Sequence, residues 1–244
     1  TLDLTSNLSL SSDVSGLTVG KEGNTANITI NSAQTIAGPI SVHGGDITIN
    51  QSIDTTSASP GSSRVTLVST GNVTDGASGA IDTSELLLSG GSVVLDSLNH
   101  NVATIAGSGM SAVSFTDSSG GLTIGTIGGV SGVSATGEIL IETLVGDLTV
   151  ASNVATTGTT ANAVRLNAGR SAAIGNPTGG DILLSGTPSI TAGTGGIVKL
   201  YSGSRYADGG ALTNFVGGES NARYDVDETT STFTPALSAN NSYA

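Results

Sequence analysis

The 244-residue sequence contains no cysteine and no tryptophan, and only 3% of its residues are aromatic. Without cysteine, the chain forms neither disulfides nor thiolate metal sites. A conventional globular domain of this length would carry more aromatic residues and more charge than the 11% found. No hydrophobic run approaches the roughly 18 residues of a membrane-spanning helix, and no signal peptide opens the chain. Because it begins at Thr1 without methionine, we expect a mature or excised segment of a longer protein.

Basic residues are also scarce. Seven Lys and Arg residues stand against nineteen acids, which gives a net charge of −12. Nucleic-acid phosphates would be repelled, so we expect no nucleic-acid partner. The acids are mostly single Asp residues between apolar runs, where Asp side chains typically bond their own backbone in turns.

One short pattern recurs instead along the sequence: a glycine or small residue, a polar position, then apolar, variable and apolar residues. Alternation sends Ile47 and Ile49 to one face of a strand and Thr48 to the other. The first apolar residue of successive copies falls at positions 28, 47, 65 and 86, and later at 164 and 182. This spacing of about 20 residues is at the short end of the range for solenoids.

Several short alternating runs occur within each period, separated by Gly, Ser, Asn or Asp, as several strands per coil require. The 36 glycines suit tight corners. Sustained helical periodicity is nearly absent. The sequence therefore predicts an all-β, right-handed parallel β-helix with coils of about 20 residues, packed with aliphatic side chains.

Two outward-facing sets follow from this spacing. Thr29, Thr48 and Thr66 are predicted to stack as one file, which stabilises parallel strands. An ice-binding face would need paired, flat arrays of threonine, so a single file argues against that function. Beyond Leu86 the outward position becomes apolar. Exposed apolar side chains in a line indicate contact with another rod or with a covering segment, and burial under a loop is the alternative. The residues in this outward position are Leu87, Val94, Leu140 and Leu183.

Between Leu98 and Ile127 the alternation is looser, so we expect a longer corner or an insertion there. The two histidines, His43 and His100, lack partners at catalytic or metal-ligand spacing. We interpret both as turn or surface residues.

The composition changes at Tyr201, which divides the chain into a rod (1–200) and a non-repetitive C-terminal arm (201–244). Six of the seven aromatic residues lie at or after Tyr201, and the arm ends in an extended, linker-like run. The arm is interpreted as a cap on the last coil or a connection to another domain. Alternatively, it forms a contact site for a partner or glycan, with Tyr rings for stacking and acids for sugar hydroxyls: Tyr201, Tyr206, Tyr224, Asp225, Asp227 and Glu228.

No cofactor or metal site is predicted. Asp225, Asp227 and Glu228 are acids of the kind that hold Ca²⁺, but they lack the glycine turn and fixed spacing of a known calcium loop. Asp46 and its equivalents Asp147 and Asp181 lie whole coils apart without a nearby Lys or Arg, so we expect no enzyme. Neighbouring coils can still bring two carboxylates to glycosidase distance. A carbohydrate-active β-helix enzyme, either a polysaccharide lyase or a hydrolase, is therefore the alternative.

Several of these runs resemble the β-helical repeats of filamentous haemagglutinin-like adhesins, large exoproteins of two-partner secretion. The tail from Tyr201 to Pro235 is similar to the junction that follows such repeats. The runs that carry the resemblance are 44–50, 71–74, 164–169 and 179–185.

The resemblance implies a secreted or cell-surface rod that passes an outer-membrane transporter during export. It further implies attachment to a ligand on host or bacterial cells, glycans included, or a role in biofilms. A long, acidic, cysteine-free repeat chain is also suited to display and spacing. Uncapped end coils would allow self-association into fibres.

Overall fold

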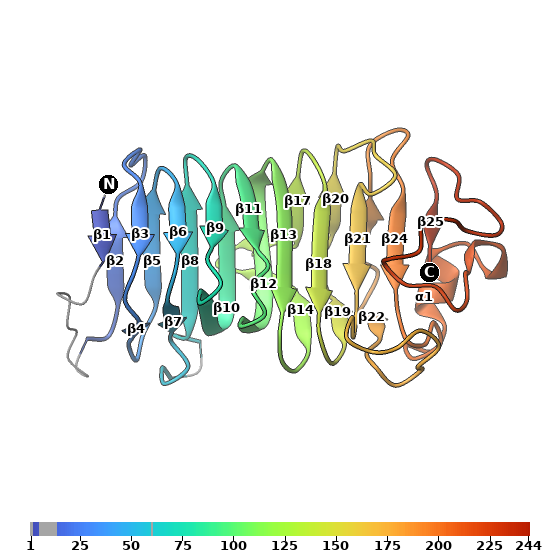
Figure 1. Cartoon of the computed structure of the whole chain (residues 1–244), viewed down its shortest axis with the longest axis horizontal. Helices are drawn as coiled ribbons and strands as arrows, with labels where there is room; N and C mark the ends of the chain where they lie inside the picture. Colours follow the sequence, from blue (N-terminus) through green and yellow to red (C-terminus); the bar gives the residue numbers. More distant parts are fainter. Residues whose placement is uncertain (1, 5–13, 60) are drawn as a thin grey trace.

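The computed structural model describes residues 2–4, 14–59 and 61–244. Most of its strands stack in parallel along one long axis (Figure 1). The predicted Leu8-Ser9-Leu10 alternation lies outside the described residues. Most strands belong to two long parallel sheets, so the all-β fold with parallel, solenoid-like sheets is confirmed.

The first sheet contains ten strands. In spatial order they are β1 (Leu2–Leu4), β3 (Ile28–Ile30), β6 (Ile47–Ile49), β9 (Val73–Asp75), β11 (Ser92–Leu95), β13 (Ala112–Asp117), β18 (Ile139–Thr143), β21 (Val164–Asn167), β24 (Val198–Tyr201) and β25 (Ser242–Tyr243).

The second sheet contains thirteen strands. Its main path is β2 (Leu17–Gly20), β5 (Ile40–Gly44), β8 (Arg64–Ser69), β10 (Ala80–Ser89), β12 (Asn101–Met110), β14 (Leu122–Ile124), β19 (Leu148–Val150) and β22 (Ile182–Leu184). Beside it pair β4 (Gln34–Thr35), β7 (Ser52–Asp54), β17 (Val133–Ala135), β20 (Val154–Thr156) and β23 (Ile190–Thr191).

Side-chain alternation builds the core between the sheets. Ile47 and Ile49 are fully buried, whereas Thr48 between them is half-buried. Aliphatic residues at the same register stack from coil to coil, and each fully buried side chain contributes roughly 1.5–3 kcal/mol. One such file is Ile28, Ile47, Val73, Val93, Val113, Ile139, Val164 and Val198.

The predicted threonine file is wrong beyond Thr48. Thr29 and Thr48 pair as expected, but the next member is Thr74 of β9. Thr66 lies in the second sheet, beside Ser41. The reason is that each coil contains more than one strand with the same alternation, so a regular sequence spacing joined residues of different sheets.

The same error affects the outward apolar positions and the coil spacing. Val94 and Leu140 lie in the first sheet, while Leu87 and Leu183 lie in the second, so they form no single line. Register partners in the first sheet are separated by unequal steps, from 28 to 47, then 73, 93, 113, 139, 164 and 198. Corners of different length account for the differences.

The irregular region predicted from Leu98 to Ile127 contains the long strand β12, which pairs with both β14 and β17. An antiparallel hairpin follows, formed by β15 (Thr126–Ile127) and β16 (Val130–Ser131).

Neither histidine is the surface residue expected from the sequence. His100 is fully buried, with its Nε2 2.8 Å from Asp75 Oδ2 and 3.2 Å from Ser97 Oγ. Its ring stacks on Phe115 at a centroid distance of 5.6 Å. His43 is a half-buried residue of β5. The acidic partner of His100, Asp75, is 25 residues earlier in the sequence, so linear spacing does not indicate it.

Several corner side chains join successive coils. Asn27 Oδ1 accepts the Asp46 N–H at 3.0 Å, Asp46 Oδ1 accepts the Asn72 N–H at 2.9 Å, and Asn72 Oδ1 accepts the Ser92 N–H at 3.0 Å. This differs from the turn chemistry that we expected, in which Asp bonds its own local backbone. Asp54 does bond locally, through the Thr56 N–H. The ladder satisfies backbone donors that exposed corners would otherwise leave to water.

Asp147 and Asp181 make the same contact with each other, so they are not isolated as predicted. Asp147 Oδ1 accepts the Asp181 N–H at 2.9 Å, and Asp181 Oδ1 accepts the Ser204 N–H at 2.5 Å. Both carboxylates therefore serve as structural acceptors.

The C-terminal arm contains a short helix α1 (Ala211–Phe215) and a 3₁₀ turn η1 (Glu219–Asn221). Its last strand, β25, returns to pair in parallel with β24. The division of the chain at Tyr201 stays a prediction.

Candidate functional site

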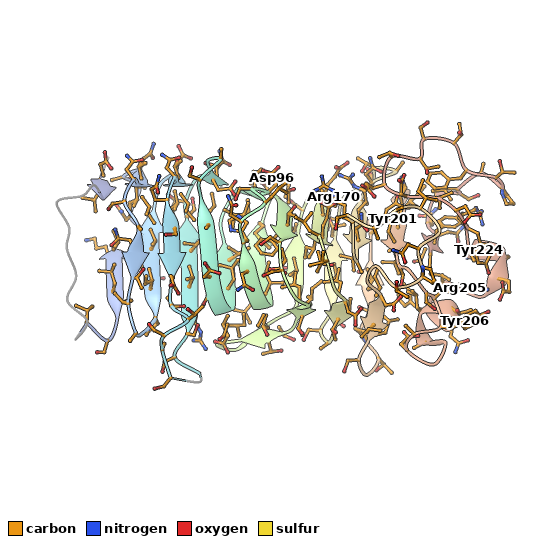
Figure 2. The ribbon with its side chains drawn as sticks, turned by 60° about the horizontal axis from the view of Figure 1, so that its bottom comes forward. Asp96, Arg170, Tyr201, Arg205, Tyr206 and Tyr224 are labelled. Atoms are coloured by element: carbon orange, nitrogen blue, oxygen red, sulfur yellow. The ribbon has the colours of Figure 1, made fainter. Side chains whose placement is uncertain are left out.

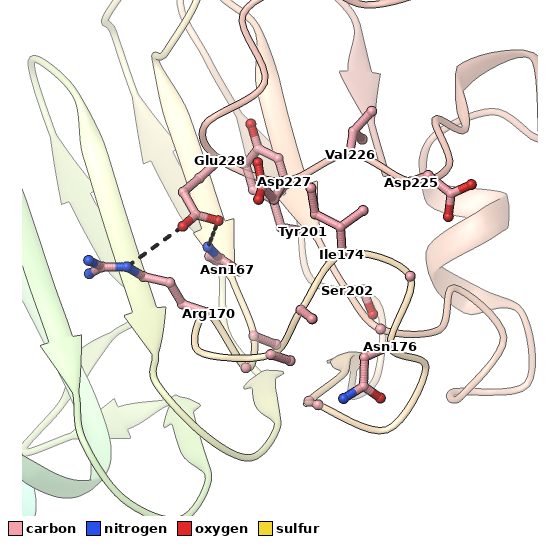
Figure 3. A pocket seen from close by; sticks show the side chains of 18 of the residues that line it. Asn167, Arg170, Ile174, Asn176, Tyr201, Ser202, Asp225, Val226, Asp227 and Glu228 are labelled. Carbon is pink, nitrogen blue, oxygen red and sulfur yellow. Dashed lines mark hydrogen bonds and ion pairs between the residues drawn. The ribbon is translucent and has the colours of Figure 1, made fainter.

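A pocket of about 240 Å³ lies near the C-terminal end of the stack (Figure 3). Its walls are the loop between β21 and β22, the end of β24 with the following residues, and the arm segment 223–228. Residues far apart in the sequence therefore meet in one hollow.

Glycines shape the loop side of this pocket. Gly169 has a φ of 68°, and a Cβ there would lie 2.2 Å from the carbonyl oxygen of Gly179. The base of the loop, where Gly169 and Gly180 approach, therefore requires residues without side chains. Because the backbone closes there, residues 170–179 extend as a separate loop toward the arm.

Five of the six residues predicted as a contact site line this pocket: Tyr201, Tyr224, Asp225, Asp227 and Glu228. Tyr201 is the half-buried last residue of β24. Among the described residues, no hydrogen bond reaches its hydroxyl group. Burial raises the pKa of Tyr201 to about 12, so the group stays protonated and able to donate.

The three acids point in different directions (Figure 3). Glu228 Oε2 accepts a hydrogen bond from Asn167 Nδ2 at 3.1 Å, and Glu228 Oε1 lies 3.8 Å from Arg170 Nε. Asp227 Oδ1 accepts the Thr229 N–H at 2.9 Å and the Thr229 hydroxyl at 2.6 Å.

The hydrogen bonds from Thr229 lower the pKa of Asp227. The carboxylate of Asp225 has no hydrogen-bond partner within the described part of the chain. No group of three His, Cys, Asp or Glu side chains in 2–4, 14–59 and 61–244 is arranged to hold a metal ion.

Sequence reasoning missed the loop side of the pocket, including Asn167, Arg170 and Asn176. Asn167 is 3% exposed although it is polar. The turn residues Asn176-Pro177 and Gly179-Gly180 mark a loop, but nothing in the linear sequence indicates that it meets the arm. The hydrogen bond from Asn167 to Glu228 spans 61 residues.

Arg170 connects two carboxylates at the edge of the pocket. Its Nη1 donates to Glu142 Oε2 at 2.9 Å, and its Nε faces Glu228. Glu142 is only 4% exposed. A buried acid, a more exposed acid and a guanidinium group therefore lie together.

The sixth predicted residue, Tyr206, belongs to a neighbouring aromatic cluster, toward the C-terminal end in Figure 2. The Arg205 guanidinium lies 4.5 Å from the Tyr206 ring centre and 5.1 Å from that of Tyr224. Glu219 accepts hydrogen bonds from Arg205 Nη2 and from both tyrosine hydroxyls. The pKa of Glu219 is lowered, first by the Tyr206 hydroxyl and then by Arg205.

Within the described residues, no helix is both long and apolar enough to span a membrane. Comparisons with protein-family models, curated proteins and solved structures find no match to this chain.

Proposed function

We propose that the chain is a non-catalytic extracellular rod that acts in attachment, surface display or the structure of a biofilm. The observation that carries the proposal is the position of the pocket and the aromatic cluster. Both lie near one end of an axial stack whose N-terminus is at the other end (Figure 1). At about 4.8 Å per strand, the ten strands of the first sheet span about 43 Å. A rod of this length would hold the pocket and the aromatic cluster away from the surface to which its other end is attached.

The resemblance to filamentous haemagglutinin-like exoproteins supports a secreted or cell-surface location and passage through an outer-membrane transporter. Coils that stack on their predecessors also suit export as an unfolded chain, because each new coil is templated by the last. The partner would be a ligand on host or bacterial cells. The finer features of the proposed fold are a right-handed coil and a basic coil of about 20 residues, as in the steps from 73 to 93 and from 93 to 113, with longer corners added elsewhere.

A single rod is favoured over an end-to-end fibre. At the C-terminal end, β25 occupies the edge of β24 and α1 lies against β22. An edge that is already paired offers fewer free backbone groups to another molecule.

Cell binding tests the proposal directly. The purified chain, fluorescently labelled, is incubated with host epithelial cells and with bacteria, and the retained fraction is compared with that of the heat-unfolded chain. Saturable retention of the folded chain alone is expected. Equal retention of both forms, or of neither, would exclude attachment. Negative-stain electron microscopy should show short single rods, whereas continuous filaments would indicate a fibre subunit.

The arrangement of Glu142, Arg170 and Glu228 favours one alternative, a carbohydrate-active lyase or hydrolase. Two carboxylates and a basic residue meet at the edge of a pocket, as such chemistry requires. New reducing ends released from a panel of polysaccharides would identify an enzyme, provided that Glu228→Gln abolishes them.

A further inference from the structure

We propose that the pocket binds a single non-acidic hexose or hexosamine unit of a glycan, and that it rejects sialylated and sulfated sugars. This inference rests on the proposed attachment function and specifies the ligand of its site.

The first argument is the size of the pocket. A volume of about 240 Å³ is below the roughly 300 Å³ at which pockets for drug-sized ligands begin. One sugar ring is of the appropriate size, whereas a folded peptide segment is too large. The pocket opens between a loop and the arm, so the rest of a glycan would extend into solvent.

The second argument is the set of free polar groups. Within the described ranges, the Tyr201 hydroxyl is a donor and acceptor without a hydrogen-bond partner, and the Asp225 carboxylate is an acceptor without one. Asp227 keeps Oδ2 free because Oδ1 receives the bonds from Thr229 and Thr230. Acceptors beside a neutral donor match sugar hydroxyls, each of which both donates and accepts.

The third argument is charge. Both arginines of the pocket are already engaged: Arg170 with Glu142 and Glu228, and Arg223 with backbone carbonyl oxygens and the Tyr243 ring. Arg170 therefore already faces two carboxylates, and two of the three guanidinium nitrogens of Arg223 are occupied by backbone oxygens. Three carboxylates and a chain net charge of −12 repel such groups, whereas an ammonium group is attracted.

The rim adds an aromatic surface. Tyr224 lines the pocket and is 63% exposed, although Arg205 lies against its ring. An amphipathic ring of this kind suits the apolar C–H face of a sugar, with polar groups around its edge.

Saturation-transfer NMR on the full chain tests the inference. The probes are methyl glycosides of glucose, galactose and mannose, the corresponding 2-amino sugars, N-acetylneuraminic acid and a sulfated galactoside. Transfer to at least one neutral or amino sugar, and none to the acidic sugars, is expected. Binding of no neutral or amino sugar, or equal binding of acidic ones, would overturn the inference.

Tyr201→Phe locates the binding in the pocket. The hydroxyl has no partner in the part of the chain that the structure describes, so its removal should leave the melting temperature unchanged. It should weaken sugar affinity about fivefold, the value of one hydrogen bond. Tyr206→Phe, outside the pocket, makes the same chemical change and should leave affinity unchanged. Asp225→Asn keeps a side chain that tolerates the observed φ of 54°, and it should weaken amino sugars more than neutral ones. Unchanged affinity in Tyr201→Phe refutes the assignment.

The two proposals fail separately. If the chain binds sugars but not cells, the attachment function is wrong and the pocket assignment holds. If Tyr201→Phe is retained on cells as well as the wild type and no sugar binds, attachment holds and the pocket assignment is wrong.

Discussion

Replacing Asp117 with asparagine is expected to stabilise the protein at neutral pH. Asp117 is the last residue of β13 and its side chain is fully buried. Its Oδ1 accepts the Val102 N–H at 2.8 Å, whereas its Oδ2 is buried without a partner in the described chain. Burial raises the pKa of Asp117 from 3.8 to about 6. Backbone hydrogen bonds from Val102 and Ser119 and the electrostatic effect of His100 oppose the shift.

The magnitude follows from the two pKa values. Between pH 3.8 and about 6 the folded chain holds a proton on Asp117 that the unfolded chain has lost. The contribution of this residue to stability is therefore fully present below pH 3.8 and is lost as the pH rises through about 6. A difference of about two pKa units corresponds to about 3 kcal/mol. Asparagine keeps the acceptor for Val102 without a charge, so it avoids this loss.

Urea unfolding followed by circular dichroism at pH 4, 5, 6, 7 and 8 measures the effect. The free energy of unfolding of Asp117→Asn should lie within about 0.6 kcal/mol of the wild-type value at pH 4 and exceed it by about 3 kcal/mol at pH 8. Asp96→Asn, on an exposed corner (Figure 2), removes the same charge and should follow the wild type throughout. A difference that is constant with pH, or a less stable Asp117→Asn variant at pH 8, would refute the reasoning.

Two further predictions concern the corners, and urea unfolding measures both. Asp46→Ala should lower the free energy of unfolding by about 1 kcal/mol because the Asn72 N–H loses its acceptor. Asp46→Asn retains the oxygen and should change it little. Equal losses in the two variants would contradict the role of the corner hydrogen bonds. Gly132→Ala should destabilise by more than 2 kcal/mol, since φ is 73° and the new Cβ would lie 1.9 Å from the Asn153 carbonyl oxygen. Gly129→Ala, with φ 87° and no atom within 4 Å, should cost only about 1 kcal/mol; similar losses at both glycines would refute the clash.

The sequence determined the strand chemistry because side-chain alternation is local. Ile47 and Ile49 against Thr48 indicate a half-buried strand without knowledge of any neighbour. The change in composition at Tyr201 likewise pointed to the arm, whose predicted contact residues include five that line the pocket.

Tertiary structure alone decided which strands pair and what the corners hold. Thr66 and Thr74 each follow a buried valine, and only the lengths of the connecting corners place Thr74 beside Thr48. His100 meets Asp75 across 25 residues and Asp117 meets Val102 across 15 residues, so no linear motif indicates these pairs. The pocket likewise depends on the glycine-closed loop after β21 meeting an arm about sixty residues later in the chain. Local periodicity fixes the strands of this protein, and corner length and long-range packing fix its site.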